Sequence, residues 1–339
     1  MAPSLSSTHS KPLRGLFYLM AGFLLIAYCG AVARHWIETR RDAEASLHYL
    51  NTTLVQNTRT TLRNYGLILR GIGTELVEKG TLDTPENGLA LFERIRSIDP
   101  GMAGFGLART DGQLILVSGI PPGAPLPNLV QQSETRESFL KSLQTGKLEI
   151  GRPYYMTLLK EWVIPVRVPL FDAQGRPTAV MTAGYPIEGG HSLLANATLP
   201  PNTATMLLRD DGYMQYFHPL PPGRRERILY GCFTRKAAPS TLERLSAQNP
   251  SKDSLLLNMP NLGGWHLVVH ERIPEYGLNA SALVPLGALL HEWLQRLIAP
   301  TLLFAAFLLG ATLVYRRAVR RQTAADAAVA RLSDWRETV

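Results

Sequence analysis

Cysteine and charged residues are both scarce in this 339-residue chain. It contains two cysteines, and Asp, Glu, Lys and Arg together make up 18% of it, whereas 45% of the residues are hydrophobic. So few cysteines exclude a disulfide-stapled miniprotein, and so many apolar residues exclude a disordered chain. Cys29 lies within an apolar run, so we interpret Cys232 as a buried free thiol, with an intermolecular disulfide as the alternative.

Two long runs, residues 15–33 and 297–315, lack Asp, Glu, Lys and Arg altogether. At about 1.5 Å per residue, a helix of this length spans the roughly 30 Å hydrocarbon layer of a membrane. We therefore predict two transmembrane helices. The alternatives are buried helices of a soluble core and, for the first run, a signal peptide cleaved after Ala31-Val32-Ala33.

Positive charges flank the two runs on what we predict to be the cytoplasmic side. Lys11 and Arg14 precede the first run, and six arginines against three acids follow the second, within residues 316–339. The positive-inside rule then places both termini in the cytoplasm and residues 34–296 outside. Much of the net charge of +8 thus reports topology, and no basic patch interleaved with aromatics indicates a nucleic-acid partner.

Residues 34–80 are predicted to form one long amphipathic stalk helix. Apolar or small residues recur every three or four positions from Leu47 to Leu76, and polar residues fill the other face. A second helix is predicted to begin at the N-cap Thr84-Pro85 and to run through Ile98.

The external segment then contains an internal repeat. An Arg-x-Asp-Gly sequence at Arg109 recurs one hundred positions later at Arg209, each time between two apolar strands, which predicts two β-hairpins. A helix and three strands are predicted to follow each hairpin. The order implies two tandem α+β modules, 81–195 and 196–296. The predicted helices are 134–143 and 239–248, and the predicted strands are 149–155, 162–171, 178–186, 254–259, 265–272 and 280–284.

This arrangement resembles the double-Cache (PDC) sensor domains of bacterial diguanylate cyclases, histidine kinases and chemoreceptors. The similar segments are Arg136-Glu137-Ser138-Phe139, Ile164-Pro165-Val166 and Ile273-Pro274-Glu275-Tyr276-Gly277-Leu278. The resemblance implies two PAS-like modules, a homodimer in the bacterial inner membrane with residues 34–296 in the periplasm, and a ligand in the membrane-distal module. The region it implies for ligand binding, around residues 136–167, contains Arg136, Phe139, Tyr154, Tyr155, Lys160, Trp162 and Arg167.

The chemistry of these residues suits a small anion. Arg136, Lys160 and Arg167 can complement a carboxylate, with the two arginines the best candidates, and Tyr154, Tyr155 and Trp162 can supply apolar walls. Each of them has an alternative interpretation as a solvated charge or a core aromatic. The chain lacks the Arg-x-Trp-Tyr sequence of the amino-acid-binding branch and an acid near Gly184, which leaves small carboxylates, other metabolites or no ligand open.

No catalytic motif supports an enzyme within these residues. P-loop, HExxH, nucleophile-elbow and dinucleotide-binding patterns are absent from the sequence, and we expect neither cofactor nor metal. His266, His270 and Glu271 form only a partial metal-site pattern. We predict a transmembrane sensor whose tail, residues 316–339, begins a signalling helix toward a cyclase or kinase output. The alternative is a membrane adaptor whose external modules bind a protein.

Overall fold

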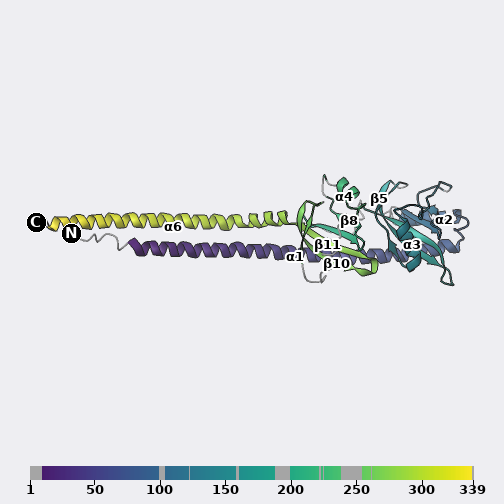
Figure 1. Cartoon of the computed structure of the whole chain (residues 1–339), viewed down its shortest axis with the longest axis horizontal. Coiled ribbons are helices and arrows are strands. Elements are labelled where there is room, and N and C mark those ends of the chain that lie inside the picture. The colour runs from purple at the N-terminus through teal and green to yellow at the C-terminus, as the bar shows by residue number, and fades with distance from the viewer. Residues whose placement is uncertain are drawn as a thin grey trace. The chain divides into compact units, whose positions relative to one another are not determined.

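The computed structural model describes residues 10–98, 104–121, 123–157, 160–187, 199–220, 223, 225–237, 254–260 and 262–337. They belong to two compact units (Figure 1). The α+β unit is Glu44–Leu286, and the helical unit comprises the chain up to Ala43 and from Gly287 onward. The helix predicted at 239–248 lies outside the described residues.

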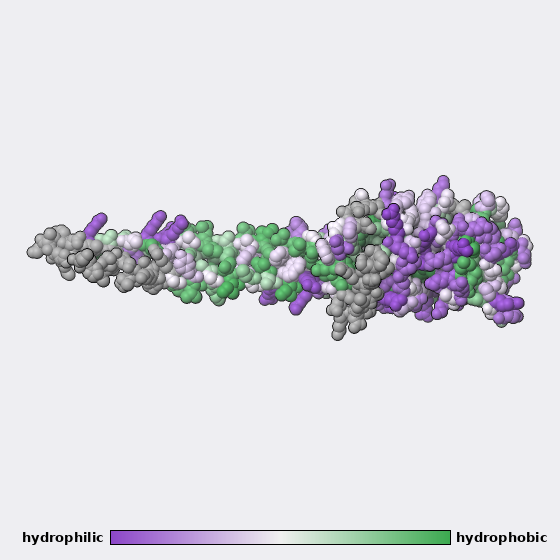
Figure 2. Space-filling view, in the orientation of Figure 1, coloured by the Kyte–Doolittle hydropathy of each residue, from purple (hydrophilic) through white to green (hydrophobic). Residues whose placement is uncertain are grey.

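The helical unit pairs the N-terminal part of α1 (Ser10–Glu78) with α6 (Leu286–Glu337). The hydroxyls of Tyr28 and Thr301 lie 2.8 Å apart, and the Tyr28 ring stacks on Phe304 at 4.5 Å between centroids. Each helix contains a stretch long and apolar enough to cross a membrane. Large apolar side chains such as Leu19 and Phe307 are exposed there, which makes this surface largely green in Figure 2. Large apolar side chains exposed along both helices are typical of a helix pair that faces lipid.

Beyond Ala43, α1 continues unbroken into the α+β unit, as its periodicity predicts. Leu47, Leu54, Leu69 and Leu76 are fully buried on one face. The helix ends at Glu78, and Gly80 then takes a left-handed conformation with φ of 70°. That conformation is nearly free of steric cost for glycine, so the chain can turn there.

Two antiparallel sheets follow α1. The first contains β1 (Gly104–Arg109), β2 (Leu114–Val117), β3 (Glu149–Ile150), β4 (Tyr154–Met156), β5 (Glu161–Phe171) and β6 (Pro177–Pro186). The second contains β7 (Ala204–Arg209), β8 (Met214–His218), β9 (Leu255–Met259), β10 (Gly264–Ile273) and β11 (Leu278–Pro285). Their strand orders, β2-β1-β6-β5-β3 and β8-β7-β11-β10-β9, are equivalent, with β4 added beside β5. The prediction of an α+β fold whose strands repeat in two similar antiparallel sheets is confirmed.

The repeated hairpins match in detail. Gly112 and Gly212 have φ of 91° and 97°, and their amides donate to the carbonyls of Arg109 and Arg209. Each hairpin has a register shift at the same place, at Leu107/Ala108 in the first and Leu207/Leu208 in the second. Such turns require positive φ, which explains the glycine of the repeated Asp-Gly.

The helices cover the sheets and close the core. They are α2 (Glu86–Ile98), α3 (Arg136–Thr145), α4 (Arg225–Gly231) and the short 3-10 turn η1 (Pro274–Tyr276). Phe105, Val166 and Met181 of the first sheet share a core with the leucines of α1. Val117 and Val180 lie on the opposite face of the sheet. They pack there against Phe139 of α3 and Leu129 of the loop before α3. We call residues 123–135 of that loop the strap.

The structure corrects two elements. The strand predicted at 149–155 is two strands, β3 and β4, separated by residues 151–153. Pro153 has no amide hydrogen to donate to a ladder, and Gly151 packs so closely that a Cβ would lie 2.6 Å from Pro165 Cγ. Helix α4 was not predicted, because seven residues carry too little periodicity to be recognised.

The second hairpin yields a prediction about acid stability. Burial tends to raise the pKa of Asp210, but bonds from Arg272 (2.6 Å) and Asn279 (2.8 Å) outweigh it and hold that pKa below its usual value. A depressed folded-state pKa stabilises the protein above the unfolded value, near 3.9, and the contribution is lost as the pH falls through the folded value. We expect Asp210→Asn to lower stability at pH 7 by under about 1 kcal/mol, because the carboxylate is 39% exposed.

The measurement is urea unfolding of both proteins between pH 7 and pH 3. The gap between the wild type and Asp210→Asn is expected to close as the pH falls. A gap that stays constant over this range would show that the carboxylate charge contributes nothing.

Candidate ligand-binding site

A row of three residues crosses the first sheet beneath the strap. Gly106 of β1 lies opposite Thr182 of β6, and Thr182 lies opposite Arg167 of β5. Residues directly opposite on paired strands project from the same face, so Thr182 and Arg167 point the same way. Gly106 contributes no side chain, and an added Cβ would lie 2.9 Å from both Leu114 and Thr182.

Arg167 is almost fully buried on this row, with 1% of its surface exposed. Its Nη1 donates to Thr182 Oγ1, whereas Nε and Nη2 make no hydrogen bond of good geometry among the described residues, with the Tyr154 hydroxyl the acceptor nearest to forming one. These two nitrogens lie on one edge of the planar guanidinium, the edge that donates to both oxygens of a carboxylate. A buried charge without a partner is costly, so this edge is suited to an anion.

The surroundings of Arg167 shift two pKa values. Burial lowers the pKa of the Arg167 guanidinium, and the neighbouring Tyr154 opposes that change. Burial also raises the pKa of Tyr154, and the charge of Arg167 counteracts part of the rise. Arginine stays protonated in proteins even when its pKa falls, and a tyrosine with a raised pKa stays neutral. The site therefore presents a cation and an uncharged hydroxyl.

Two cavities adjoin at Tyr154. The inner cavity, beside Arg167, has a volume of about 20 Å³, close to that of one water-sized probe. The outer cavity has a volume of about 540 Å³, within the usual range for small-molecule sites. Both cavities are lined by Leu114, Leu129, Tyr154 and Met156. An anionic group could thus lie inside while the rest of a ligand lies outside.

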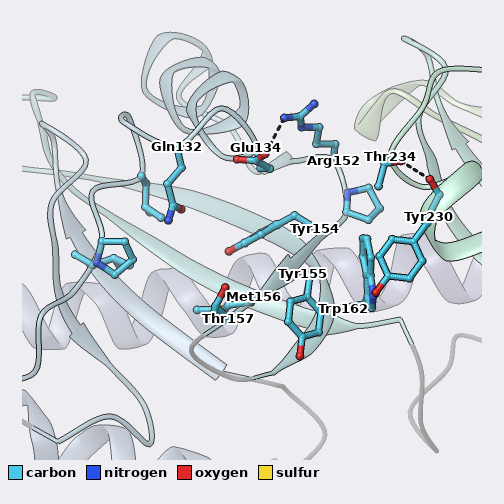
Figure 3. A pocket seen from close by; sticks show the side chains of 14 residues that line it. Gln132, Glu134, Arg152, Tyr154, Tyr155, Met156, Thr157, Trp162, Tyr230 and Thr234 are labelled. Atoms are coloured by element: carbon cyan, nitrogen blue, oxygen red, sulfur yellow. Dashed lines mark hydrogen bonds and ion pairs between the residues drawn. The ribbon is translucent and has the colours of Figure 1, made fainter. Parts of the chain in front are cut away.

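The outer cavity takes residues from both modules (Figure 3). Trp162 forms edge-to-face contacts with Tyr155 at 6.1 Å and with Tyr230 of α4 at 5.3 Å. Glu134 of the strap lies 3.6 Å from Arg152, and both line the cavity on the same side (Figure 3). The pKa of Glu134 is lowered by bonds from the Ser133 hydroxyl and its own backbone, so it is an anion at neutral pH.

The predicted binding residues occupy different places. Tyr154, Tyr155 and Trp162 line the outer cavity, and Arg167 and Tyr154 line the inner one. Phe139 is buried in the core under the strap. Arg136 is exposed at the start of α3, and Lys160 is exposed with φ of 55°; neither lines a cavity described here.

Sequence reasoning missed Thr182, Glu134 and Tyr230. Strand alternation could have placed Thr182 on the face of Arg167, had the register of β5 and β6 been known. Glu134 lay within the predicted helix at 134–143, whereas it belongs to the strap. No sequence signal relates Tyr230 to this cavity, because only folding brings α4 to it.

The histidine pair of the second sheet forms no recognisable metal site. His266 and His270 are buried, with Nδ1 atoms 2.9 Å from Gly264 O and 3.3 Å from Ser281 Oγ. Glu271 points to the other face, 3.8 Å from Arg59. In the described part of the chain, no group of three or more His, Cys, Asp or Glu side chains could hold a metal ion.

Comparison with known proteins identifies the fold. No protein-family model matches the sequence, and no curated protein sequence matches it significantly. The structure is similar to the extracellular domain of rpHK1S-Z16, a protein assigned as a histidine kinase, with a TM-score of 0.58 and 18% identity over 72% of this chain and 95% of that one. The α+β unit has the double-Cache sensor fold.

Chemoreceptor domains share this fold. The sensory domain of Campylobacter jejuni Tlp3, solved with isoleucine, matches with a TM-score of 0.50 and 14% identity over 75% of this chain and 97% of that one. The ligand-binding domain of Pseudomonas aeruginosa PctB, solved with L-Gln, has a TM-score of 0.50 and 15% identity over 70% and 89%. At these identities the double-Cache fold is established, and the ligand of this chain must be argued from its own residues.

Proposed function

We propose that this protein is a membrane-anchored sensor whose double-Cache unit binds a small carboxylate at Arg167. The observation that carries the proposal is that Arg167 is 1% exposed, while its Nε and Nη2 edge faces only the Tyr154 hydroxyl and makes no hydrogen bond of good geometry among the described residues. A carboxylate would supply two charge-assisted hydrogen bonds and relieve the cost of the buried charge. The inner cavity, which has room for about one water, adjoins Arg167, and the outer cavity has room for the remainder of a ligand.

The membrane anchor in this proposal consists of the apolar parts of α1 and α6. Trp36 and Trp293 pack edge to face at 5.5 Å, where the apolar runs end, and tryptophan is enriched at membrane interfaces. Basic residues follow the other end of the α6 run, from Arg316 onward. These features support a periplasmic double-Cache unit and cytoplasmic termini in a bacterial inner membrane.

Signalling in this proposal passes through α6 to a cytoplasmic output. α6 continues as one helix from Leu286 to Glu337, so a displacement at its start can be transmitted along its length. A diguanylate cyclase or a kinase domain, in this protein or in a partner, would be the receiving output, and the receptor would act as a homodimer. A ligand shifts such an equilibrium only through its differential affinity for the two states.

A binding experiment on the full chain in lipid nanodiscs tests the proposal. The probes are acetate, lactate, succinate and a set of L-amino acids, assayed by thermal shift and calorimetry. We expect at least one carboxylate to bind, and Arg167→Lys to weaken it by about 10-fold or more, because lysine cannot form the two-point contact. Arg176→Lys, at an arginine 75% exposed in the β5–β6 turn, is the matched control and is expected to bind normally.

Two results would count against a carboxylate site at Arg167. One is the absence of binding by every probe carboxylate. The other is equal affinity in the wild type and in Arg167→Lys.

A further inference from the structure

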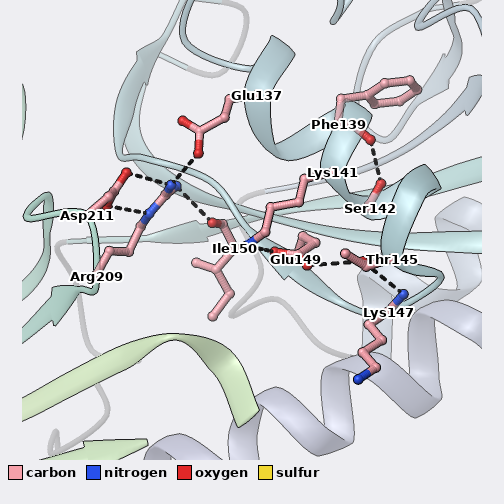
Figure 4. Close-up of polar contacts among 10 residues, drawn as sticks. All are labelled: Glu137, Phe139, Lys141, Ser142, Thr145, Lys147, Glu149, Ile150, Arg209 and Asp211. Carbon is pink, nitrogen blue, oxygen red and sulfur yellow. Dashed lines mark hydrogen bonds and ion pairs between the residues drawn. The ribbon is translucent and has the colours of Figure 1, made fainter. Parts of the chain in front are cut away.

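Arg209, at the end of β7 in the second module, binds two elements of the first module (Figure 4). Its Nη1 donates to the carbonyl of Ile150 in β3 at 3.0 Å, and its Nη2 donates to Glu137 in α3 at 2.7 Å. Asp211 accepts from Nε and Nη2 at 3.0 and 2.8 Å, which holds the guanidinium in place. Arg209 is 9% exposed and its bond to Ile150 is buried, whereas its carboxylate partners Glu137 and Asp211 are 57% and 30% exposed.

The two elements that Arg209 binds are themselves joined. Glu149 of β3 accepts from Lys141 at 2.8 Å and from Thr145 at 3.1 Å, both in α3. Just after β3, a Cβ added to Gly151 would lie 2.6 Å from Ser138 Oγ of α3, so no free space separates the two. Packed elements of this kind shift together rather than deform. We refer to α3 and residues 149–151 as the α3–β3 block.

The α3–β3 block lies directly beside Arg167. Glu149 is opposite Arg167 in the β3–β5 ladder, although its carboxylate bonds to α3 instead of to the arginine. Ile150, which Arg209 binds, is opposite Val166, the next residue along β5. An anion that draws the Arg167 side chain toward the inner cavity therefore acts on β5. The neighbouring residue of β5, Val166, is paired with Ile150, which Arg209 binds.

On its other side, Arg209 is connected to the strand that precedes α6. Arg209 is opposite Leu278, the first residue of β11, in the β7–β11 ladder. The adjacent Asp210 bonds to Asn279 of β11 at 2.8 Å and to Arg272 of β10 at 2.6 Å. β11 ends at Pro285, and α6 begins at the next residue.

The repeat provides an internal comparison. Arg109 occupies the position of Arg209 in the first hairpin, but it is exposed, and its Nη2 donates to the carbonyl of Leu82, before α2. Among the contacts of the described residues, the same local sequence therefore joins the two modules in its second copy and not in its first. This makes Arg109 a natural control for any effect of Arg209.

We propose that Arg209 is a positioning residue that couples the Arg167 site to β11, and through β11 to α6, by holding the α3–β3 block against the second module. The proposal rests on the function proposed above, since it assigns Arg209 to regulation by that site. Removing Arg209 should leave the anion site intact but separate it from the second module.

A ligand-free mutant cycle tests the coupling. Full chains in nanodiscs carry Arg167→Met, Arg209→Gln or both, and hydrogen exchange is followed in residues 204–218 and 278–285. Exchange is normalised to the slowest amides of the first sheet, which report any change in global stability. After this normalisation, in the wild-type background we expect Arg167→Met to change exchange there by about 5-fold or more, the lower end of ordinary coupling between sites. In the Arg209→Gln background, the effect of Arg167→Met on exchange in these residues should fall below about 2-fold.

Two further variants exclude a general structural effect. Glu137→Ala removes only the contact with α3, at a side chain that is 57% exposed, and it is expected to reduce the coupling without unfolding the protein. Arg109→Gln is expected to leave the coupling unchanged. The proposal is overturned if Arg167→Met does not affect the second module, if its effect persists without Arg209, or if Arg109→Gln abolishes it equally.

This result is separable from the binding experiment. If the coupling depends on Arg209 but no carboxylate binds, the role of Arg209 is supported and the carboxylate ligand is rejected. If a carboxylate binds and needs Arg167, but the exchange changes do not depend on Arg209, the sensor function is supported and the coupling role of Arg209 is rejected.

Discussion

Arg167→Met is expected to stabilise the ligand-free protein while abolishing its response to carboxylates. The wild-type guanidinium is buried with two nitrogens unpaired, and such a charge makes folding less favourable. Methionine fills a similar space without a charge and adapts to irregular cavities. Replacing buried charges with apolar side chains has stabilised other proteins by about 1–4 kcal/mol, and we expect a gain of about 1–3 kcal/mol here.

Thermal unfolding of the full chain in nanodiscs, with and without a binding carboxylate, measures both effects. For a unit of this size, each kcal/mol corresponds to roughly 2–4 °C in Tm. The ligand-free variant should therefore unfold several degrees above the wild type, and added carboxylate should raise only the wild-type Tm.

The control is Arg136→Met, at an exposed arginine whose charge is already in water. Its stability should remain within about 0.5 kcal/mol of the wild type. A fall in Tm for ligand-free Arg167→Met would contradict the interpretation, because it would mean that the guanidinium already stabilises the fold without an anion.

Gly73 and Gly71 of α1 are expected to respond in opposite directions to substitution by alanine. A Cβ at Gly73 would lie 2.5 Å from Met181 and 2.6 Å from Leu170, both in the first sheet, whereas nothing lies within 4 Å of a Cβ at Gly71. Alanine favours a helix by up to about 1 kcal/mol over glycine, and overpacking typically costs about 1–3 kcal/mol. Gly73→Ala should therefore lower stability by about 1–2 kcal/mol, and Gly71→Ala should raise it by about 0.5–1 kcal/mol.

Denaturant unfolding monitored by circular dichroism compares the two variants directly, and the midpoints should move to opposite sides of the wild type. Since the substitutions are chemically identical and two residues apart, the helix-propensity term cancels in the comparison. If both substitutions stabilised the protein, α1 would not pack against the sheet at Gly73 as closely as the structure indicates.

The repeated hairpins and the long helices could be predicted because their signals are local. The Asp-Gly turns require glycine at positive φ, and Gly112 and Gly212 both supply it. The spacing of Leu47, Leu54 and Leu76 predicts one buried face of α1, and all three are fully buried. The break between β3 and β4 was missed because it depends on the close packing of Gly151 against α3, which is a tertiary contact.

The candidate site, too, was determined partly by the sequence and partly by the tertiary structure alone. Sequence chemistry by itself selected Arg136 and Arg167 as equivalent candidates for an anion, since residue type and approximate position carry no information on burial. The tertiary structure separated them: a strand beneath the strap buries Arg167 with one edge unpaired, while the first turn of α3 leaves Arg136 in solvent. Only the packing of the two modules brings Tyr230 to the outer cavity and Arg209 to the α3–β3 block, because both contacts join residues far apart in the chain.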